Sequence, residues 1–135
     1  VVTCYYGRGD EIKAYTEDIF EGLVKHTDSK EDGVRAEVAE CLGGLARIEP
    51  EKTIRFLEKS IAAKAAYTRA VAVAAFRYAL DQKTREHITP VRLEIFLSTL
   101  KDKDIEVRKQ AVLTFQDILV NSQLMNLKKN SVLLK

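Results

Sequence analysis

The stretch DGVRAEVAECLGGLARI, residues 32–48, decides the fold class of this chain. Its apolar residues recur every three or four positions, which places them on one face of an α-helix. The members of this apolar stripe are Val34, Val38, Cys41, Leu42 and Leu45. A helix with one apolar face has to bury that face against other elements. The stretch therefore predicts a helix that packs against neighbours through its stripe.

Two glycines, Gly43 and Gly44, interrupt this helix near its end. Glycine inside a helix costs about 1 kcal/mol relative to alanine. We interpret the two glycines as a place where a neighbouring helix packs closely. Cys41 is assigned to the core, because a buried cysteine behaves as a small hydrophobic residue.

The same periodicity on both sides of residues 32–48 predicts an all-α chain. The chain has only 6 glycines and 2 prolines, too few breakers for many short strands. Pro50 and Pro90 each suit the first turn of a helix, and Thr89 is a candidate N-cap. The predicted helical segments are about 12–26, 32–48, 50 to the alanine-rich 62–66, 67–80, 89–100, 105–120 and 122–135.

Three arginines set the register of an internal repeat. Arg35, Arg69 and Arg108 each precede a small apolar residue by three positions and a large one by seven. They lie 34 and 39 residues apart, in the range of HEAT and armadillo two-helix repeats. We therefore predict an α-α superhelix, a HEAT-repeat solenoid. Residues 1–135 form a single segment with repeats at about 12–48, 50–82 and 89–120 and a partial repeat at 122–135.

The arginines are expected to have structural roles. Glu31 before Arg35 and Asp104 before Arg108 resemble the acidic-then-arginine signature of HEAT repeats, whose side chains bond within and between turns. The middle repeat has alanine at 65 and 66 where the acid should be. This difference predicts that the ladder of side-chain bonds is broken at Arg69.

Composition excludes several classes of protein. The 22 basic and 20 acidic residues are interspersed, so there is no basic face for nucleic acid. No apolar run reaches the ~18 residues that span a membrane. Cys4 and Cys41 fit no metal or disulfide framework, which favours reduced thiols in the cytoplasm or nucleus. Because the chain begins with valine, we expect it to be an excerpt of a longer solenoid.

No constellation of residues predicts catalysis. His26 and His87 are the only histidines, and a solvated or structural role is expected for both. The integrin-type tripeptide within residues 7–10 is interpreted as part of a flexible turn. No phosphate-binding loop, zinc helix or nucleophile elbow occurs. We predict no catalytic, metal or cofactor-binding residues, no small-molecule substrate and no enzyme activity.

Several stretches together resemble the cullin-associated, neddylation-dissociated protein family. The match runs from about Tyr15 to Phe115, in the same order and with nearly the same spacing. It departs from the family at the alanine-rich residues 62–66 and at both ends, 1–10 and 120–135. The matching stretches are residues 31–35, 38–43, 45, 48–51, 67–69, 96–100, 103–108 and 111–115.

The resemblance implies a non-catalytic scaffold. Family members are long HEAT solenoids that wrap around a cullin lacking its ubiquitin-like modifier, together with its RING partner. They act as exchange factors in the assembly of cullin-RING ubiquitin ligases in the cytoplasm and nucleus. The excerpt resembles the C-terminal third, which lies toward the receptor-binding end of the cullin.

The second, fourth and sixth helical segments are expected to line the concave, partner-binding side. Their outward polar residues, the candidate protein-binding residues, are Glu37, Glu40, Arg77, Asp81, Lys109 and Gln116. Two alternatives remain open. One is another HEAT scaffold, such as a nuclear transport receptor or a phosphatase regulatory subunit. The other is an enzyme built on helical repeats, which would need a cleft with converging titratable groups.

Overall fold

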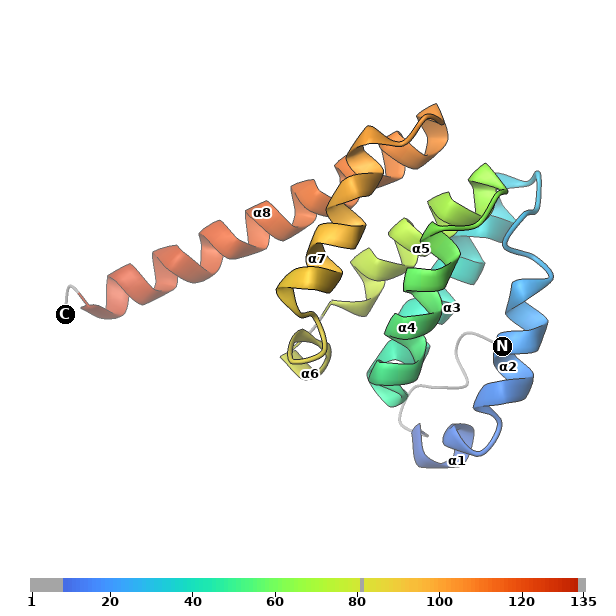
Figure 1. The fold of residues 1–135 in the computed structure, drawn as a ribbon. Helices are drawn as coiled ribbons and strands as arrows, with labels where there is room; N and C mark the ends of the chain where they lie inside the picture. The colour runs from blue at the N-terminus through green and yellow to red at the C-terminus, as the bar shows by residue number, and fades with distance from the viewer. Residues whose placement is uncertain (1–8, 81, 134–135) are drawn as a thin grey trace.

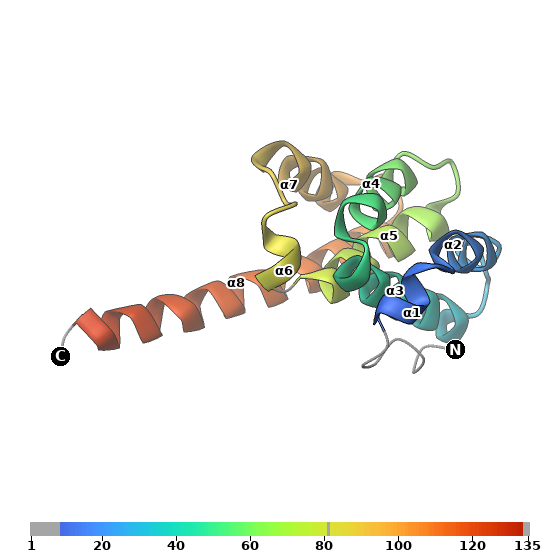
Figure 2. The same cartoon turned by 90° about the horizontal axis from the view of Figure 1, so that it is seen from below.

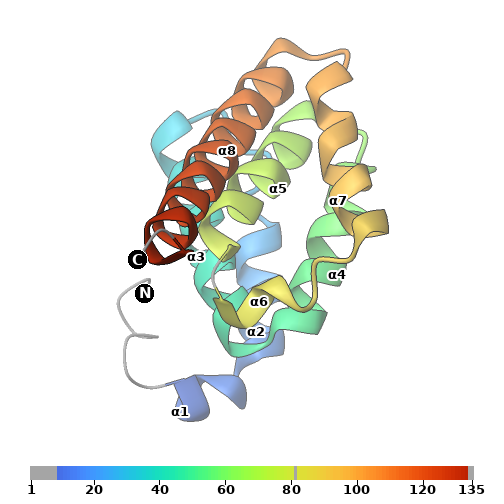
Figure 3. The same cartoon turned by 90° about the vertical axis from the view of Figure 1, so that its left-hand side faces the viewer.

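A computed structural model describes residues 9–80 and 82–133, and every regular element in them is helical (Figure 1). One layer contains α2, α4 and α7, and the other contains α3, α5 and α8 (Figures 2 and 3). Successive helices alternate between the layers, so three helix pairs stack side by side. The elements are α1 (Gly9–Lys13), α2 (Thr16–Val24), α3 (Asp32–Ile48), α4 (Pro50–Ile61), α5 (Ala66–Ala79), α6 (Gln82–Arg85), α7 (Pro90–Leu97), the 3-10 helix η2 (Ser98–Lys101) and α8 (Ile105–Leu133). This architecture confirms the predicted all-α superhelix of HEAT type.

Helix α3 forms as its sequence predicts, with the expected bounds. Val38, Leu42 and Leu45 are buried in the core. Cys41 is buried with them, and this burial raises the pKa of its thiol. Helix α5 crosses α3 at Gly43, where a Cβ atom would lie 2.9 Å from the carbonyl carbon of Tyr78 and closer still to its Cβ. The interpretation of this glycine as a site of close helix packing is confirmed.

Helix α5 is the centre of the core, because it is buried between α3 on one side and α8 on the other (Figure 2). Buried residues occur on every side of this helix. Phe76 stacks on Phe96 of α7 with ring centroids 3.9 Å apart, which ties the middle pair of helices to the last pair. The buried α5 side chains are Arg69, Ala70, Val71, Ala72, Val73, Ala74, Ala75, Phe76 and Ala79.

The first predicted segment, 12–26, is not one helix. Helix α1 ends at Lys13 and α2 begins at Thr16, with Tyr15 between them 63% exposed rather than inward. The hydroxyl of Thr16 donates to the carbonyl of Lys13 at 2.9 Å, a local bond that competes with helix continuation. Val24 is also exposed, so Phe20 is the buried anchor of this segment.

The predicted segments 105–120 and 122–135 form one helix over the described residues. Helix α8 runs from Ile105 to Leu133 and extends well beyond the body of the stack (Figure 1). No glycine or proline lies between residues 105 and 133, so nothing in the sequence stops the helix. The predicted separate helix at 122–135 is therefore wrong. Residues 134–135 lie outside the described residues, as does Cys4.

Helix α8 buries most of its apolar stripe against the core, with one exception. Val112 was expected to point inward but is 55% exposed. Val107, Ala111 and Phe115 are buried as predicted, and Thr114 takes the remaining place in the core. Its hydroxyl donates to the carbonyl of Val73 on α5 at 3.1 Å, which satisfies this buried polar group.

The three register arginines bind the turns that precede their helices. In each case the guanidinium donates to the carbonyl oxygen six residues earlier along the chain. These bonds fix how each turn enters its helix, so the predicted structural role is confirmed. They are Arg35 to Ser29 at 2.6 Å, Arg69 to Ala63 at 2.9 Å and Arg108 to Asp102 at 2.7 Å.

The predicted break in the ladder at Arg69 is wrong. Its guanidinium binds both carboxylate oxygens of Asp102, in the turn before α8, at 2.9 and 3.1 Å. The missing acid is supplied by the next repeat, 33 residues later. Burial raises the pKa of Asp102, whereas the hydrogen bonds from Arg69 and from the backbone N–H of Asp104 lower it. The lowering effects together are larger, so the pKa lies below its ordinary value. This ion pair joins the second and third helix pairs.

The acids of the signature have other roles than expected. Arg35 pairs with Asp32 and not with Glu31, and its guanidinium stacks on the ring of Tyr67 in the next pair, 3.8 Å from the centroid. Asp104 does not pair with Arg108. Its carboxylate accepts the backbone N–H of Glu106 at 2.8 Å and so caps the start of α8.

A surface network joins α4 to α7 in the other layer. Arg92 donates to the two carboxylate oxygens of Glu51 at 2.6 and 3.0 Å and to Glu58 at 2.5 Å. His87 contacts Glu51 at 3.1 Å, so this histidine is structural, as expected. The hydrogen bonds from Arg92 and then His87 lower the pKa of Glu51 from 4.5 to about 2.

The free energy of unfolding is expected to fall as the pH is lowered from about 4.5 to about 2. Because the folded-state pKa of Glu51 is depressed, its contribution is complete above pH 4.5 and is lost as the carboxylate takes up a proton. Glu51 is 48% exposed, so screening keeps the effect modest. Urea denaturation across this range should show a smaller fall in Glu51→Gln. Equal pH profiles in the two proteins would contradict the assignment.

A candidate protein-binding groove

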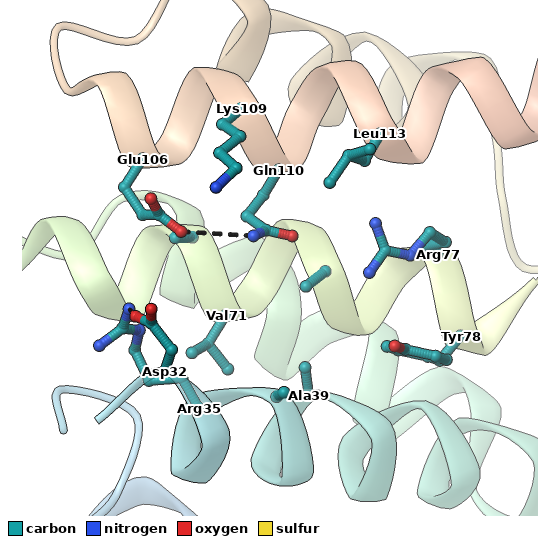
Figure 4. A pocket seen from close by; sticks show the side chains of 13 residues that line it. Asp32, Arg35, Ala39, Val71, Arg77, Tyr78, Glu106, Lys109, Gln110 and Leu113 are labelled. Carbon is teal, nitrogen blue, oxygen red and sulfur yellow. Dashed lines mark hydrogen bonds and ion pairs between the residues drawn. The ribbon is translucent and has the colours of Figure 1, made fainter. Parts of the chain in front are cut away.

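A groove lies over α5 between α3 and α8, on the side away from α4 and α7 (Figure 4). We call it the α5 groove, and its volume is about 250 Å³. Its floor consists of small side chains, because alanine fills little space between two flanking helices. The floor residues are Ala36 and Ala39 of α3 and Ala70, Val71 and Ala74 of α5.

The charges at one end of the groove are satisfied within the molecule. Asp32 pairs with Arg35, whose guanidinium also stacks on Tyr67. On the opposite wall, Glu106 accepts a hydrogen bond from Gln110 at 3.3 Å (Figure 4). Both carboxylates at this end therefore already have a hydrogen-bond partner within the protein.

Two cations that line the groove have no ion-pair partner among the described side chains. Lys109 enters from α8 next to Glu106, and Arg77 enters from α5 farther along the groove, with Gln110 and Leu113 between the two cations (Figure 4). Among the side chains that the structure describes, residues 11–80 and 84–120, no carboxylate pairs with either cation. The guanidinium carbon of Arg77 lies 5.1 Å from the ring centroid of its neighbour Tyr78. Leu113 is 40% exposed, so an apolar surface adjoins the two cations.

The structure brings only two of the predicted binding residues together. Arg77 and Lys109 line the α5 groove. Glu37 lies beside α2 instead, in a separate apolar hollow between α2 and α3. Glu40 and Gln116 line neither, and Asp81 lies outside the described residues. The binding role of all six stays a prediction.

Sequence reasoning missed the rest of the groove. Asp32, Glu106, Gln110 and Leu113 form its walls, and none was predicted as a binding residue. A signal was present in the alanines at three- and four-residue spacing on neighbouring helices, which leave space above α5. Reading that signal requires knowing that α3 and α8 flank the same helix.

The lining of the α5 groove contains carboxylates, cations and Tyr78 but no histidine, cysteine or serine. Over the described residues, no cluster of three or more metal-binding side chains occurs. In the same part of the chain, no helix is long and apolar enough to cross a membrane.

Comparison with known proteins found no matching family model and no matching solved structure. Curated relatives do match. Cullin-associated NEDD8-dissociated protein 1 of Arabidopsis thaliana is 41% identical over 108 residues, 78% of this chain. Cullin-associated NEDD8-dissociated protein 2 of Mus musculus is 32% identical over 117 residues, 84% of the chain. The C-terminal part of protein 1 of Emericella nidulans is 29% identical over 96 residues, 69% of the chain. The chain spans about 9% of the length of each.

Proposed function

Because this chain belongs to the cullin-associated NEDD8-dissociated protein family, we propose that it is part of a non-catalytic, cullin-binding solenoid. The observation that carries the proposal is 41% identity over 108 residues to a protein named for its association with cullins. The stacked helix pairs support it, since a stack of repeats offers an extended surface to a partner. The match to a polypeptide named as a C-terminal part supports a place toward that end of the family.

The proposed partner surface is the face formed by α3, α5 and α8. It carries the α5 groove, and it presents Arg77 and Lys109 from two different helix pairs. We retain Glu37, Glu40, Asp81 and Gln116 as further proposed contacts. Exposed charges on helices are usually only solvated, so most of the binding energy is expected from a few central residues.

The proposed mechanism is competition for a surface of the cullin. The ion pair between Arg69 and Asp102 and the stacked rings of Phe76 and Phe96 hold the second and third helix pairs together. A rigid face pays little ordering entropy on binding. It could therefore occupy a cullin lacking NEDD8, with its RING partner, and loosen a substrate-receptor module. This action would regulate the assembly of cullin-RING ligases in the cytoplasm and nucleus.

Cullins lacking NEDD8 are expected to co-purify with the tagged protein from cell extract, enriched over their NEDD8-modified forms. Quantitative mass spectrometry of the eluate measures the ratio. The matched control is an unrelated helical-repeat protein of similar length, carrying the same tag. In a second arm, this chain replaces the matching stretch of the Arabidopsis relative, and cullin binding by that relative should be retained.

Two results would contradict the proposal. One is the recovery of small GTPases or a phosphatase catalytic subunit in place of cullins, which would support another HEAT scaffold. The other is loss of cullin binding in the chimeric relative while the chimera remains folded by circular dichroism. In that case this stretch would not support the family's activity.

A further inference from the structure

We propose that the α5 groove binds an acidic segment of the partner, with one aspartate or glutamate side chain placed between Arg77 and Lys109. This inference rests on the proposed function, because the segment would belong to the bound cullin. It goes further by assigning the groove, the two contact residues and the chemistry of what they contact.

The distribution of charge decides the sign of the occupant. The groove holds three cations and two carboxylates, and both carboxylates already have partners: Asp32 binds Arg35, and Glu106 accepts from Gln110. Because Gln110 is neutral, the three cations and two carboxylates give the groove a net charge of +1, and Arg77 and Lys109 are the cations without an ion-pair partner. A carboxylate placed between them would gain hydrogen bonds from a guanidinium and an ammonium group. A basic residue between these two cations would meet like charge, which disfavours binding.

The shape of the groove limits the size of the occupant. A volume of about 250 Å³ corresponds to roughly eight water molecules at about 30 Å³ each. This space accommodates one or two side chains and not a folded element. The alanines of the floor and the exposed part of Leu113 offer apolar surface next to the two cations. An acidic residue beside a small apolar residue therefore fits both parts of the site.

The two cations come from different helix pairs, and this makes the site depend on the stack. Arg77 lies on α5 of the second pair and Lys109 on α8 of the third. Their relative position is fixed by the ion pair between Arg69 and Asp102, which joins the same two pairs. The groove therefore forms only when the helix pairs are stacked. Separate repeats would present two isolated charges.

Charge reversal at both cations, Arg77→Glu with Lys109→Glu, should weaken binding to purified cullin lacking NEDD8 about tenfold or more. The measurement is the dissociation constant of the protein at two salt concentrations, by surface plasmon resonance. Binding of the unaltered protein should weaken as salt rises, and the double variant should show a smaller salt dependence. The matched control is Lys59→Glu, an exposed charge reversal on α4 in the other layer.

A photo-reactive phenylalanine analogue in place of Leu113 identifies the segment itself. It should cross-link to a cullin peptide that contains aspartate or glutamate. Binding of the double variant equal to that of the Lys59→Glu control would overturn the inference and leave the proposed function intact. A cross-linked peptide with no acidic residue would do the same. No binding by the unaltered protein, in isolation or in the chimeric relative, would overturn both.

Discussion

Replacing Arg69 with alanine is expected to lower the free energy of unfolding by about 3–5 kcal/mol. The side chains of Arg69 and Asp102 are only 8% and 13% exposed, so the substitution leaves a nearly buried carboxylate without its partner. It also removes the bonds from the guanidinium to the carbonyl oxygens of Ala63 and Lys64, which lie in the turn before α5. Urea denaturation followed by circular dichroism measures the loss.

A second arginine provides the control for this prediction. Arg108 makes the same kind of bond to the carbonyl six residues earlier, but no carboxylate of the described residues pairs with it. Arg108→Ala should therefore cost only about 1 kcal/mol, the net value of one hydrogen bond. A double variant of Arg69 and Asp102 should lose less than the sum of the two single variants. Equal losses in Arg69→Ala and Arg108→Ala would show that the ion pair contributes nothing.

The contrast between these arginines shows what the sequence could predict. The register at Arg35, Arg69 and Arg108 was visible because it depends on positions within one helix, and the bond to the preceding turn follows from that register. The partner of Arg69 was not visible. Asp102 belongs to the next repeat, and the local pattern offered only alanines. Contacts between repeats depend on how far one helix pair slides along another, which periodicity does not determine.

Helix ends and buried helix faces could also be predicted only where they depend on the local sequence. Pro50 and Pro90 marked true helix starts, because proline acts on its own backbone. The break before Thr16 depends on a hydrogen bond from the threonine hydroxyl to the carbonyl oxygen of Lys13. Many threonines within helices do not form such a bond, so the break was not predictable from the residue type. On α8, the periodicity did not predict that the polar Thr114 is buried and bonded to α5 while Val112 is exposed.

The α5 groove was beyond sequence reasoning for a further reason. It requires three helices to be placed before any residue can be assigned to its floor or walls. The prediction that outward polar residues lie on the second, fourth and sixth helical segments was sufficient to find Arg77 and Lys109. The same argument also selected Glu37, which lies in a different hollow beside α2. The outward direction of a side chain on one helix does not determine which neighbouring helix it lies beside.

Replacing Gly43 with alanine is expected to lower the free energy of unfolding by about 2 kcal/mol, although alanine is the better helix former. Its intrinsic propensity would favour the folded state by about 1 kcal/mol. The new Cβ, however, would lie 2.9 Å from the backbone carbonyl carbon of Tyr78 and closer to its Cβ. Neither atom can rotate away, so α3 and α5 would have to move apart, and overpacking of this kind costs roughly 3 kcal/mol at the upper end.

An exposed glycine separates this packing effect from helix propensity. Gly22 lies within α2, and a Cβ atom there would meet nothing within 4 Å. Gly22→Ala should therefore raise the free energy of unfolding by up to about 1 kcal/mol, opposite in sign to Gly43→Ala. Because both substitutions add the same methyl group to a helix, a difference in sign can arise only from the neighbouring helix. If Gly43→Ala were as stable as Gly22→Ala, α5 could not lie against Gly43 as closely as the fold requires.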